Sequence, residues 1–202
     1  MKSTHLPISS IAELHRLLEL PPPAHPLVSV IDMSSIPCTF DSDTTHVTYS
    51  FYSICIKNGF KGKLKYGQNF YDFDNGVMTF FQPNQIISTV VDPDNKMSGW
   101  WLVFHPEFLL GYGLSAAMRD YGYFSYAVHE ALHLSDKEEK LITAIMQQIA
   151  AEYDSAIDNF SQDVMISQIE LVLNYCNRFY NRQFITRKHA NNDLLSRLEA
   201  IL

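Results

Sequence analysis

The segment Tyr71–Ile87, YDFDNGVMTFFQPNQII, holds two runs of strand-forming residues on either side of Asn75-Gly76, and a third run starts after residues 82–84. A two-residue type I′ turn needs positive φ at both central residues, a conformation that asparagine and glycine tolerate best. The segment therefore predicts a β-hairpin that turns at Asn75-Gly76, with another strand close behind it.

Similar runs extend over residues 28–104. They are rich in β-branched and aromatic residues, and Gly-, Asn- and Pro-containing segments separate most of them. The runs are LVSVI, VTYSFYSICI, NFYDF, VMTFF, IISTVV and WWLVF. Six or more short antiparallel strands predict a β-sandwich or a β-barrel.

The first 27 residues differ from the β region in composition. Ser10 and Glu13 form a capping-box pattern, which predicts a short amphipathic helix over residues 11–20. The proline-rich stretch PPPAHP then ends this helix. We therefore expect residues 1–27 to form a mobile N-terminal arm, separate from the β core and with His15 at its surface.

Helical patterns replace the β pattern after residue 106. Ser135 and Glu138 form a second capping box, and acidic residues follow in the first turn, where they favour the positive end of a helix dipole. One apolar stripe follows on this helix: Leu141, Ile142, Ile145, Met146, Ile149 and Tyr153.

A second long helix is expected from Ser161 to about Tyr180, and it carries two apolar stripes. The first consists of Met165, Ile166, Ile169, Val172, Leu173 and Cys176, and the second begins at Val164, Leu171 and Tyr175. A helix with two apolar sides needs two partners. Either both sides pack within one chain, or one side contacts a second copy; we predict a homodimer through Val164, Gln168, Leu171 and Tyr175.

A third helical stripe occupies the last twelve residues, NNDLLSRLEAIL. Asn191 or Asn192 is a candidate N-cap, and Leu194, Leu195 and Leu198 follow at helical spacing. This stripe either folds back onto the domain or leads into further sequence, and we expect the natural polypeptide to continue.

Overall charge and cysteine content narrow the function classes. The net charge is −7 and the pI is near 5.5, which argues against nucleic-acid binding by the chain as a whole. Residues 178–202 are an exception, with five basic and two acidic residues (5 − 2 = +3), so the remainder carries −10.

Cys38, Cys55 and Cys176 are widely spaced and suggest neither a disulfide framework nor a zinc ribbon. With no signal-peptide or membrane-spanning pattern, a cytoplasmic protein is expected.

Residues 52–108 resemble the cupin-type regulatory domain of AraC-family transcriptional regulators. The resemblance is carried by YSICIKNG, FDNGVMTFFQPNQI and GWWLVFHPEFL, and the following helix pair matches the layout of this family. It implies a cupin-like antiparallel β-barrel (double-stranded β-helix) followed by a pair of α-helices, in an α+β fold. It also implies effector sensing, dimerisation and a helix-turn-helix DNA-binding domain beyond this chain.

The metal ligands of a catalytic cupin are missing from the matching segment. The second cupin motif has a glycine, a proline and then a histidine; Gly76 and Pro83 keep this frame, but Ile87 occupies the histidine position. The segment that should carry the first motif, residues 57–73, contains no histidine. Because isoleucine offers no lone pair, we expect a non-catalytic barrel without a metal or another cofactor.

One motif points to a different function. HEALH, residues 129–133, fits the His-Glu-x-x-His pattern of zinc hydrolases, in which a helix places His129 and His133 on one face with Glu130 beside the bound water. The motif requires a continuous helix, whereas Ser135 and Glu138 predict a helix start after it. We interpret the match as coincidental.

Binding rather than catalysis is therefore the predicted function, because nucleophile elbows and phosphate-binding glycine loops are also absent. Ligand pockets are mostly apolar with a few polar groups, which suits a barrel partly lined by aromatic residues. The candidate ligand-binding residues are Tyr49, Phe51, Tyr66, Phe70 and Trp101.

The predicted organisation has four parts. They are an arm (1–27), a cupin-like barrel (28–110), a connection with the dimerising helix pair (111–181) and a linker helix (182–202). The predicted function is the effector-sensing and dimerisation domain of a bacterial AraC-type regulator, with a small-molecule effector and DNA contacts made only by a further domain. The alternatives are a stand-alone cupin-like binding protein and, third, the zinc hydrolase.

Overall fold

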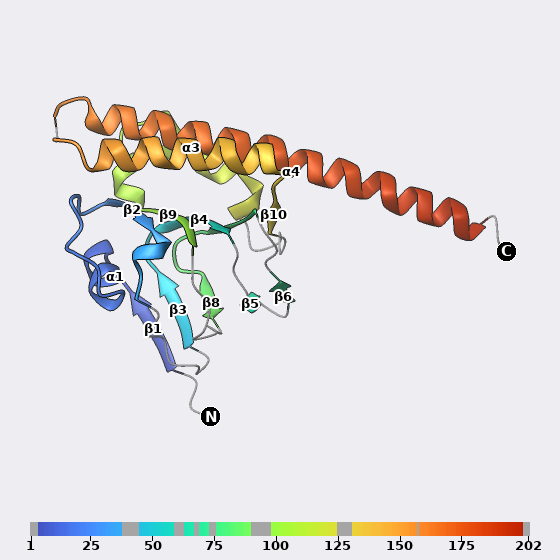
Figure 1. Ribbon diagram of the computed structural model, residues 1–202, viewed down its shortest axis with the longest axis horizontal. Coiled ribbons are helices and arrows are strands. Elements are labelled where there is room, and N and C mark those ends of the chain that lie inside the picture. The colour runs from blue at the N-terminus through green and yellow to red at the C-terminus, as the bar shows by residue number, and fades with distance from the viewer. Residues whose placement is uncertain are drawn as a thin grey trace.

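Two β-sheets and a layer of helices make up the molecule (Figure 1). The computed structural model describes residues 4–37, 45–58, 63–66, 69–72, 76–89, 98–124, 131–156 and 158–199. The α+β class is confirmed, with two mainly antiparallel sheets. No helix within these ranges combines the length and the apolar character that crossing a bilayer requires.

Sheet A lies farther from the long helices (Figure 1). Its strands, in spatial order, are β1 (Thr4–Ile8), β3 (Thr45–Tyr49), β8 (Ile86–Thr89), β5 (Lys63–Tyr66) and β6 (Asn69–Asp72). The first pair, β1 and β3, is parallel, and the other pairs are antiparallel.

Sheet B lies between sheet A and the helices. Its order is β10 (Leu132–His133), β7 (Val77–Phe81), β4 (Tyr52–Asn58), β9 (Ser98–Phe104) and β2 (Val28–Asp32), with every pair antiparallel. Each strand of sheet B has an inner face toward sheet A and an outer face toward the helices, because successive side chains of a strand point to opposite sides.

The predicted hairpin at Asn75-Gly76 is wrong. Strand β6 belongs to sheet A and β7 to sheet B, so the chain crosses between sheets here. Gly76 has a positive φ of 75°. A second reason favours glycine here, because an added Cβ would lie 2.9 Å from the Glu139 carboxylate and 3.2 Å from the Leu134 carbonyl oxygen. A short hairpin occurs instead between β5 and β6, where Tyr66 pairs with Asn69.

The run VTYSFYSICI also divides between the sheets. Strand β3 joins sheet A and β4 joins sheet B, with the crossing at Ser50 and Phe51. A continuous β-forming run cannot reveal this division, because both strands have equally favourable local composition.

The N-terminal segment is integrated into the core, contrary to the expected separate arm. Strand β1 pairs with β3, and α1 (Ile11–Leu17) buries Ile11 and Leu14 at 1% exposure each. The side chain of His15 is also buried, with its ring nitrogens 2.8 Å from Ser29 Oγ and 2.6 Å from the Pro21 carbonyl oxygen. Burial of the apolar side chains between residues 8 and 18 therefore holds this segment against the sheets, even though prolines follow it in the sequence.

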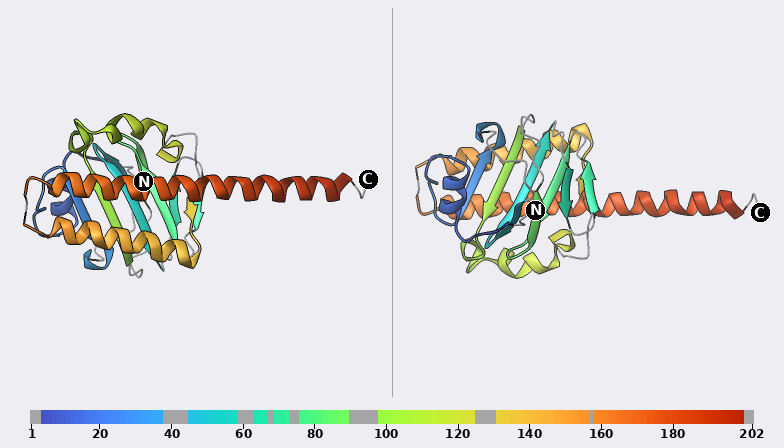
Figure 2. Two further views of the ribbon diagram at one scale, coloured as in Figure 1. Left: turned by 90° about the horizontal axis from the view of Figure 1, so that it is seen from above. Right: turned by 90° about the horizontal axis from the view of Figure 1, so that it is seen from below.

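The helical layer covers the outer face of sheet B. Helix α3 (Asp136–Tyr153) starts at the predicted capping box, with Ser135 N donating to Glu138 Oε2 at 2.9 Å. Helix α4 (Ser161–Glu199) lies between α3 and the segment 106–124 (Figure 2). That segment contains the 3-10 helices η2 (Pro106–Leu109), η3 (Met118–Asp120) and η4 (Gly122–Phe124) and the helix α2 (Gly113–Ala117).

Helix α4 is longer than expected. The sequence pattern predicts one helix to about Tyr180 and another from Asn191 or Asn192, but α4 is continuous to Glu199 and extends beyond the body (Figure 1). Residues 161–199 contain neither glycine nor proline, so no residue in this range breaks the helix.

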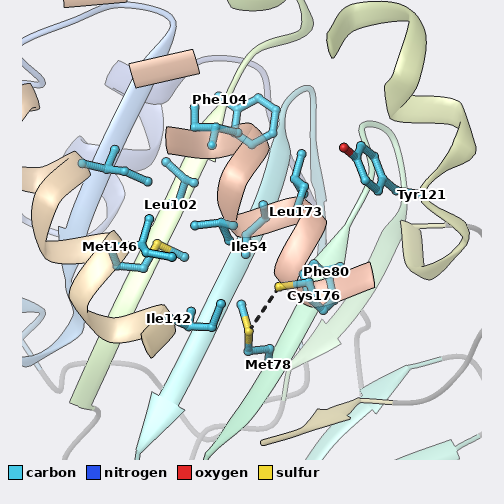
Figure 3. Packing of buried hydrophobic residues seen from close by; sticks show 14 of the residues in the cluster. Ile54, Met78, Phe80, Leu102, Phe104, Tyr121, Ile142, Met146, Leu173 and Cys176 are labelled. Carbon is cyan, nitrogen blue, oxygen red and sulfur yellow. Dashed lines mark hydrogen bonds between the residues drawn. The ribbon is translucent and has the colours of Figure 1, made fainter. Parts of the chain in front are cut away.

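Two apolar clusters stabilise the layers. One lies between the sheets and includes Val47, Phe51, Cys55, Val77 and Val103. The other lies between the outer face of sheet B and the helices, and Figure 3 shows part of it: Ile54, Met78, Phe80, Leu102, Phe104, Ile142, Met146, Leu173 and Cys176. Sheet B therefore buries both faces, which explains the nearly continuous apolar runs of β4, β7 and β9.

Candidate functional site

The inner face of sheet B presents side chains in rows across its strands. Thr79 on β7 pairs with Cys55 on β4, Cys55 pairs with Trp101 on β9, and Trp101 pairs with Ile31 on β2. The neighbouring row contains Phe81, Ser53, Val103 and Ser29. The inner face is thus mainly apolar, with a few hydroxyl groups.

Three of the predicted ligand-binding residues gather at this face. The rings of Tyr49 and Phe51 are stacked with centroids 5.1 Å apart, and Trp101 meets Tyr49 edge-on at 6.0 Å. The Trp101 indole Nε1 donates a hydrogen bond to Ser53 Oγ at 2.7 Å, which fixes the orientation of the ring. Tyr66 and Phe70 lie on β5 and β6 in sheet A, and their side chains are outside what the structure describes.

Thr79 was missed by the sequence analysis. Its side chain is 7% exposed, and its hydroxyl oxygen is buried with no hydrogen-bond partner among the described residues. An unsatisfied buried hydroxyl costs about 1–3 kcal/mol, so such a group needs an explanation, and a bound molecule supplies one. The available signal was alternation: within VMTFF, Thr79 shares its side of the strand with Val77 and Phe81.

Burial shifts the pKa values of three titratable groups on and beside the inner face. Burial raises the pKa of the Cys55 thiol to about 11, although the nearby Lys57 charge acts in the opposite direction. Cys55 is therefore a neutral thiol near pH 7, and it lies 3.4 Å from the Met33 sulfur. Burial also lowers the pKa of Lys57, which is half-buried, and raises that of Tyr49.

The two metal-binding patterns have different positions in the fold. Ile87, at the cupin histidine position, is 2% exposed and belongs to the cluster between the sheets. In HEALH, His129 and Glu130 lie outside the described residues, and Leu132–His133 form β10, paired with β7. An extended strand places His133 outside the helical register that the zinc motif needs.

A separate hollow of about 320 Å³ lies on the outer side of sheet B, beside α2 and η3. Its lining includes Tyr52, Gln82, Arg119, Tyr121 and Phe124. The negative charges of Glu170 and Asp120 help to raise the pKa of Tyr121, after the larger effect of burial.

The predicted dimer stripe follows one edge of the α4 surface. Val164 and Leu171 are 39% and 42% exposed. Gln168 and Tyr175 are half-buried, and the buried Oε1 atom of Gln168 has no hydrogen-bond partner within the described ranges. The other flank of α4 binds the segment 106–124, with the Tyr121 hydroxyl donating to Asn174 Oδ1 and the Tyr123 hydroxyl donating to the Leu173 carbonyl.

Comparisons with known proteins add no family assignment. No family model matches the chain, and no curated protein matches it.

Proposed function

We propose that this chain is the effector-sensing and dimerisation domain of a bacterial AraC-type transcription regulator. In this proposal the two sheets form a cupin-like β-barrel that binds a small molecule without transforming it. Two copies associate through α4 in the cytoplasm, and DNA is contacted by a C-terminal helix-turn-helix domain that is not part of this chain.

The arrangement of the strands supports a cupin-like barrel. From β3 to β9 the chain passes repeatedly between the sheets: β3 lies in sheet A, β4 in sheet B, the β5–β6 pair in A, β7 in B, β8 in A and β9 in B. Such alternation places inner-face residues from distant parts of the sequence around one interior. Apolar Ile87 in this interior suits a receptacle rather than a metal enzyme.

The observation that carries the binding proposal is the Thr79 hydroxyl, which is buried and has no hydrogen-bond partner in the described part of the chain. It lies in the same row as Trp101, whose ring is half-buried and contacts Tyr49. Small-molecule sites combine apolar and aromatic walls with a few polar groups that fix orientation, and this face has both. A ligand with a polar group near Thr79 would satisfy the hydroxyl.

Thr79→Val is expected to weaken effector binding while stabilising the ligand-free protein. Valine keeps the shape of threonine and removes the unpaired hydroxyl, so the free energy of unfolding should rise by about 1 kcal/mol. The dissociation constant of an inner-face ligand should rise about tenfold. A thermal-shift screen of sugars, aromatic acids and lipids on both proteins measures the two effects.

Ser53→Ala is the matched control for stability. The Ser53 hydroxyl accepts the Trp101 indole hydrogen bond, so its removal leaves a donor unpaired and should lower stability by about 1–3 kcal/mol. Loss of the Thr79 hydroxyl should therefore stabilise the ligand-free protein, and loss of the Ser53 hydroxyl should destabilise it. A ligand that raises the melting temperature of the wild type and of Thr79→Val equally would contradict the proposed site.

The exposed apolar residues of α4 support dimerisation. Val164 and Leu171 lie on one edge of the helix, and Phe160, just before α4, is 69% exposed. On α3, the exposed residues Ala144, Gln148 and Ala151 are small or uncharged, which would permit close approach of a second copy.

Leu171→Glu is expected to convert the dimer to monomers. A charge at the centre of the stripe would be buried without a partner, which should raise the dimer dissociation constant at least about a hundredfold. Ile86→Glu is the control, because it introduces the same charge at an aliphatic residue of similar exposure (53%) in sheet A. Sedimentation should detect monomers only for Leu171→Glu, and dimeric Leu171→Glu would exclude this interface.

Signalling in this proposal follows a population shift. An effector that prefers one arrangement of barrel, helices and N-terminal segment raises the population of that arrangement.

The alternative function is a stand-alone binding protein, which uses the same inner face but has no DNA-binding domain. Sequencing the gene beyond Leu202 distinguishes the two: helix-turn-helix units support the regulator, and a stop codon supports the alternative.

A further inference from the structure

Strand β7 connects the inner face to the helical layer. Val77 and Thr79 point inward, while Met78 points outward to Cys176 of α4, with 3.6 Å between the sulfur atoms (Figure 3). On the edge away from β4, β7 pairs with β10, and Val77 lies opposite His133. Next to this pair, Leu134 N donates to the Gly76 carbonyl at 2.8 Å. A shift of β7 would therefore be transmitted to both α4 and β10.

Helix α4 holds β10 from the other side. The Gln183 side chain binds the backbone twice: Nε2 donates to the Ala131 carbonyl at 3.2 Å, and Oε1 accepts from His133 N at 3.0 Å. One amide side chain thus takes the place of a neighbouring strand at this edge.

An ion pair lies next to this amide. Arg182 Nη1 binds Glu138 Oε1, and Glu138 Oε2 accepts from the backbone N and hydroxyl of Ser135 at 2.9 and 2.8 Å. These hydrogen bonds and the guanidinium hold the pKa of Glu138 below its usual value even though burial acts to raise it. Arg182 and Gln183 make these contacts with the body, and α4 continues past them to Glu199, where it extends beyond the body (Figure 1).

We propose that β10, Arg182 and Gln183 form a latch that sets the direction of the projecting half of α4. On the premise that the inner face holds the effector as proposed above, β7 transmits occupancy of that face to the latch. Strand β10 has only two residues and lies at a sheet edge, so it belongs to the elements that open at low energetic cost. When the latch opens, residues 184–199 change direction relative to the barrel.

Two valines of the inner face test the connection without any ligand. Val77 and Val103 are both 0% exposed and belong to the same cluster, but only Val77 lies opposite β10. Val77→Ala should accelerate hydrogen exchange of the His133 and Leu134 amides by about tenfold relative to Val103→Ala, as followed by NMR. Equal acceleration in both variants would mean general destabilisation and would overturn the connection.

Two amides of α4 test the latch itself. Gln183→Met removes the bonds to Ala131 and His133, whereas Asn181→Leu removes an amide that, among the described residues, binds Asn177 on its own helix. Nitroxide labels at positions 140 and 192, in a chain with Cys38→Ser, report the direction of α4. The distance distribution should broaden in Gln183→Met and Val77→Ala and stay as in the wild type in Asn181→Leu and Val103→Ala.

The result that overturns the latch is a wild-type distribution in Gln183→Met, or the same broadening in Asn181→Leu. Melting temperatures measured in parallel show that each variant is folded. Because no ligand or DNA enters these measurements, their failure leaves the binding proposal intact. Conversely, a ligand whose affinity is unchanged by Thr79→Val refutes the proposed binding site but does not bear on the latch.

Discussion

Gly99→Ala is expected to lower the free energy of unfolding by at least about 3 kcal/mol, so that less of the protein is recovered in folded form at 37 °C. Gly99 has φ of 119°, which L-residues rarely adopt. An added Cβ would lie 2.0 Å from the Ile56 carbonyl oxygen and 3.0 Å from its carbon. Both atoms belong to the backbone of β4, the central strand of sheet B, so they have little freedom to move.

Gly113→Ala is the matched control for this prediction. Gly113 lies in α2, and outside its own helix no described atom lies within 4 Å of a Cβ added there. Alanine is the better helix former, so this variant should be as stable as the wild type or up to about 1 kcal/mol more stable. Urea denaturation followed by circular dichroism compares the midpoints. Equal midpoints for the two variants would show that β4 and β9 do not approach each other as described.

Phe104→Ala has the second large expected effect, a loss of about 3–5 kcal/mol of folding free energy. The Phe104 ring is 0% exposed in the cluster between sheet B and the helices, and it stacks on Tyr52 at 5.3 Å (Figure 3). Truncation leaves a cavity that the surrounding rigid strands and helices can fill only in part. The ring faces away from the inner face, so ligand affinity of the remaining folded protein should be nearly unchanged.

Phe160→Ala controls for the loss of a phenylalanine as such. This ring is 69% exposed, so its removal should change stability by less than about 0.5 kcal/mol. Chemical denaturation at a protein concentration where both variants are monomeric makes the comparison independent of dimerisation. Similar losses for the two variants would mean that the cluster around Phe104 contributes little to folding.

Local signals in the sequence predicted several elements correctly. The Ser10 and Glu13 capping pattern marks the start of α1, and Ser135 with Glu138 marks the start of α3. The runs VMTFF and WWLVF become β7 and most of β9, and the stripe headed by Met165 is buried. These features depend on residues within one or two turns of each other, so composition and spacing suffice to recognise them.

The gathering of the Tyr49, Phe51 and Trp101 rings at the inner face could be anticipated, because aromatic residues in strands tend to occupy a buried face. Thr79 was overlooked because its significance lies in an absence of partners, which depends on every side chain packed around it. The Gln183 contacts with His133 and Ala131 were equally inaccessible, since they join residues 50 and 52 positions apart in the chain.

The sequence by itself determined the α+β class, the position of most strands and helices, and the lack of a histidine at Ile87. Tertiary structure alone decided how they assemble: β3 and β4 separate into different sheets, β6 and β7 do the same, and residues 4–18 enter the core. The physical reason is that strand pairing depends on contacts between distant residues. The residues of a strand determine how well it fits into a β-sheet. Its neighbours in space determine which sheet it joins and which of its faces is turned toward the core.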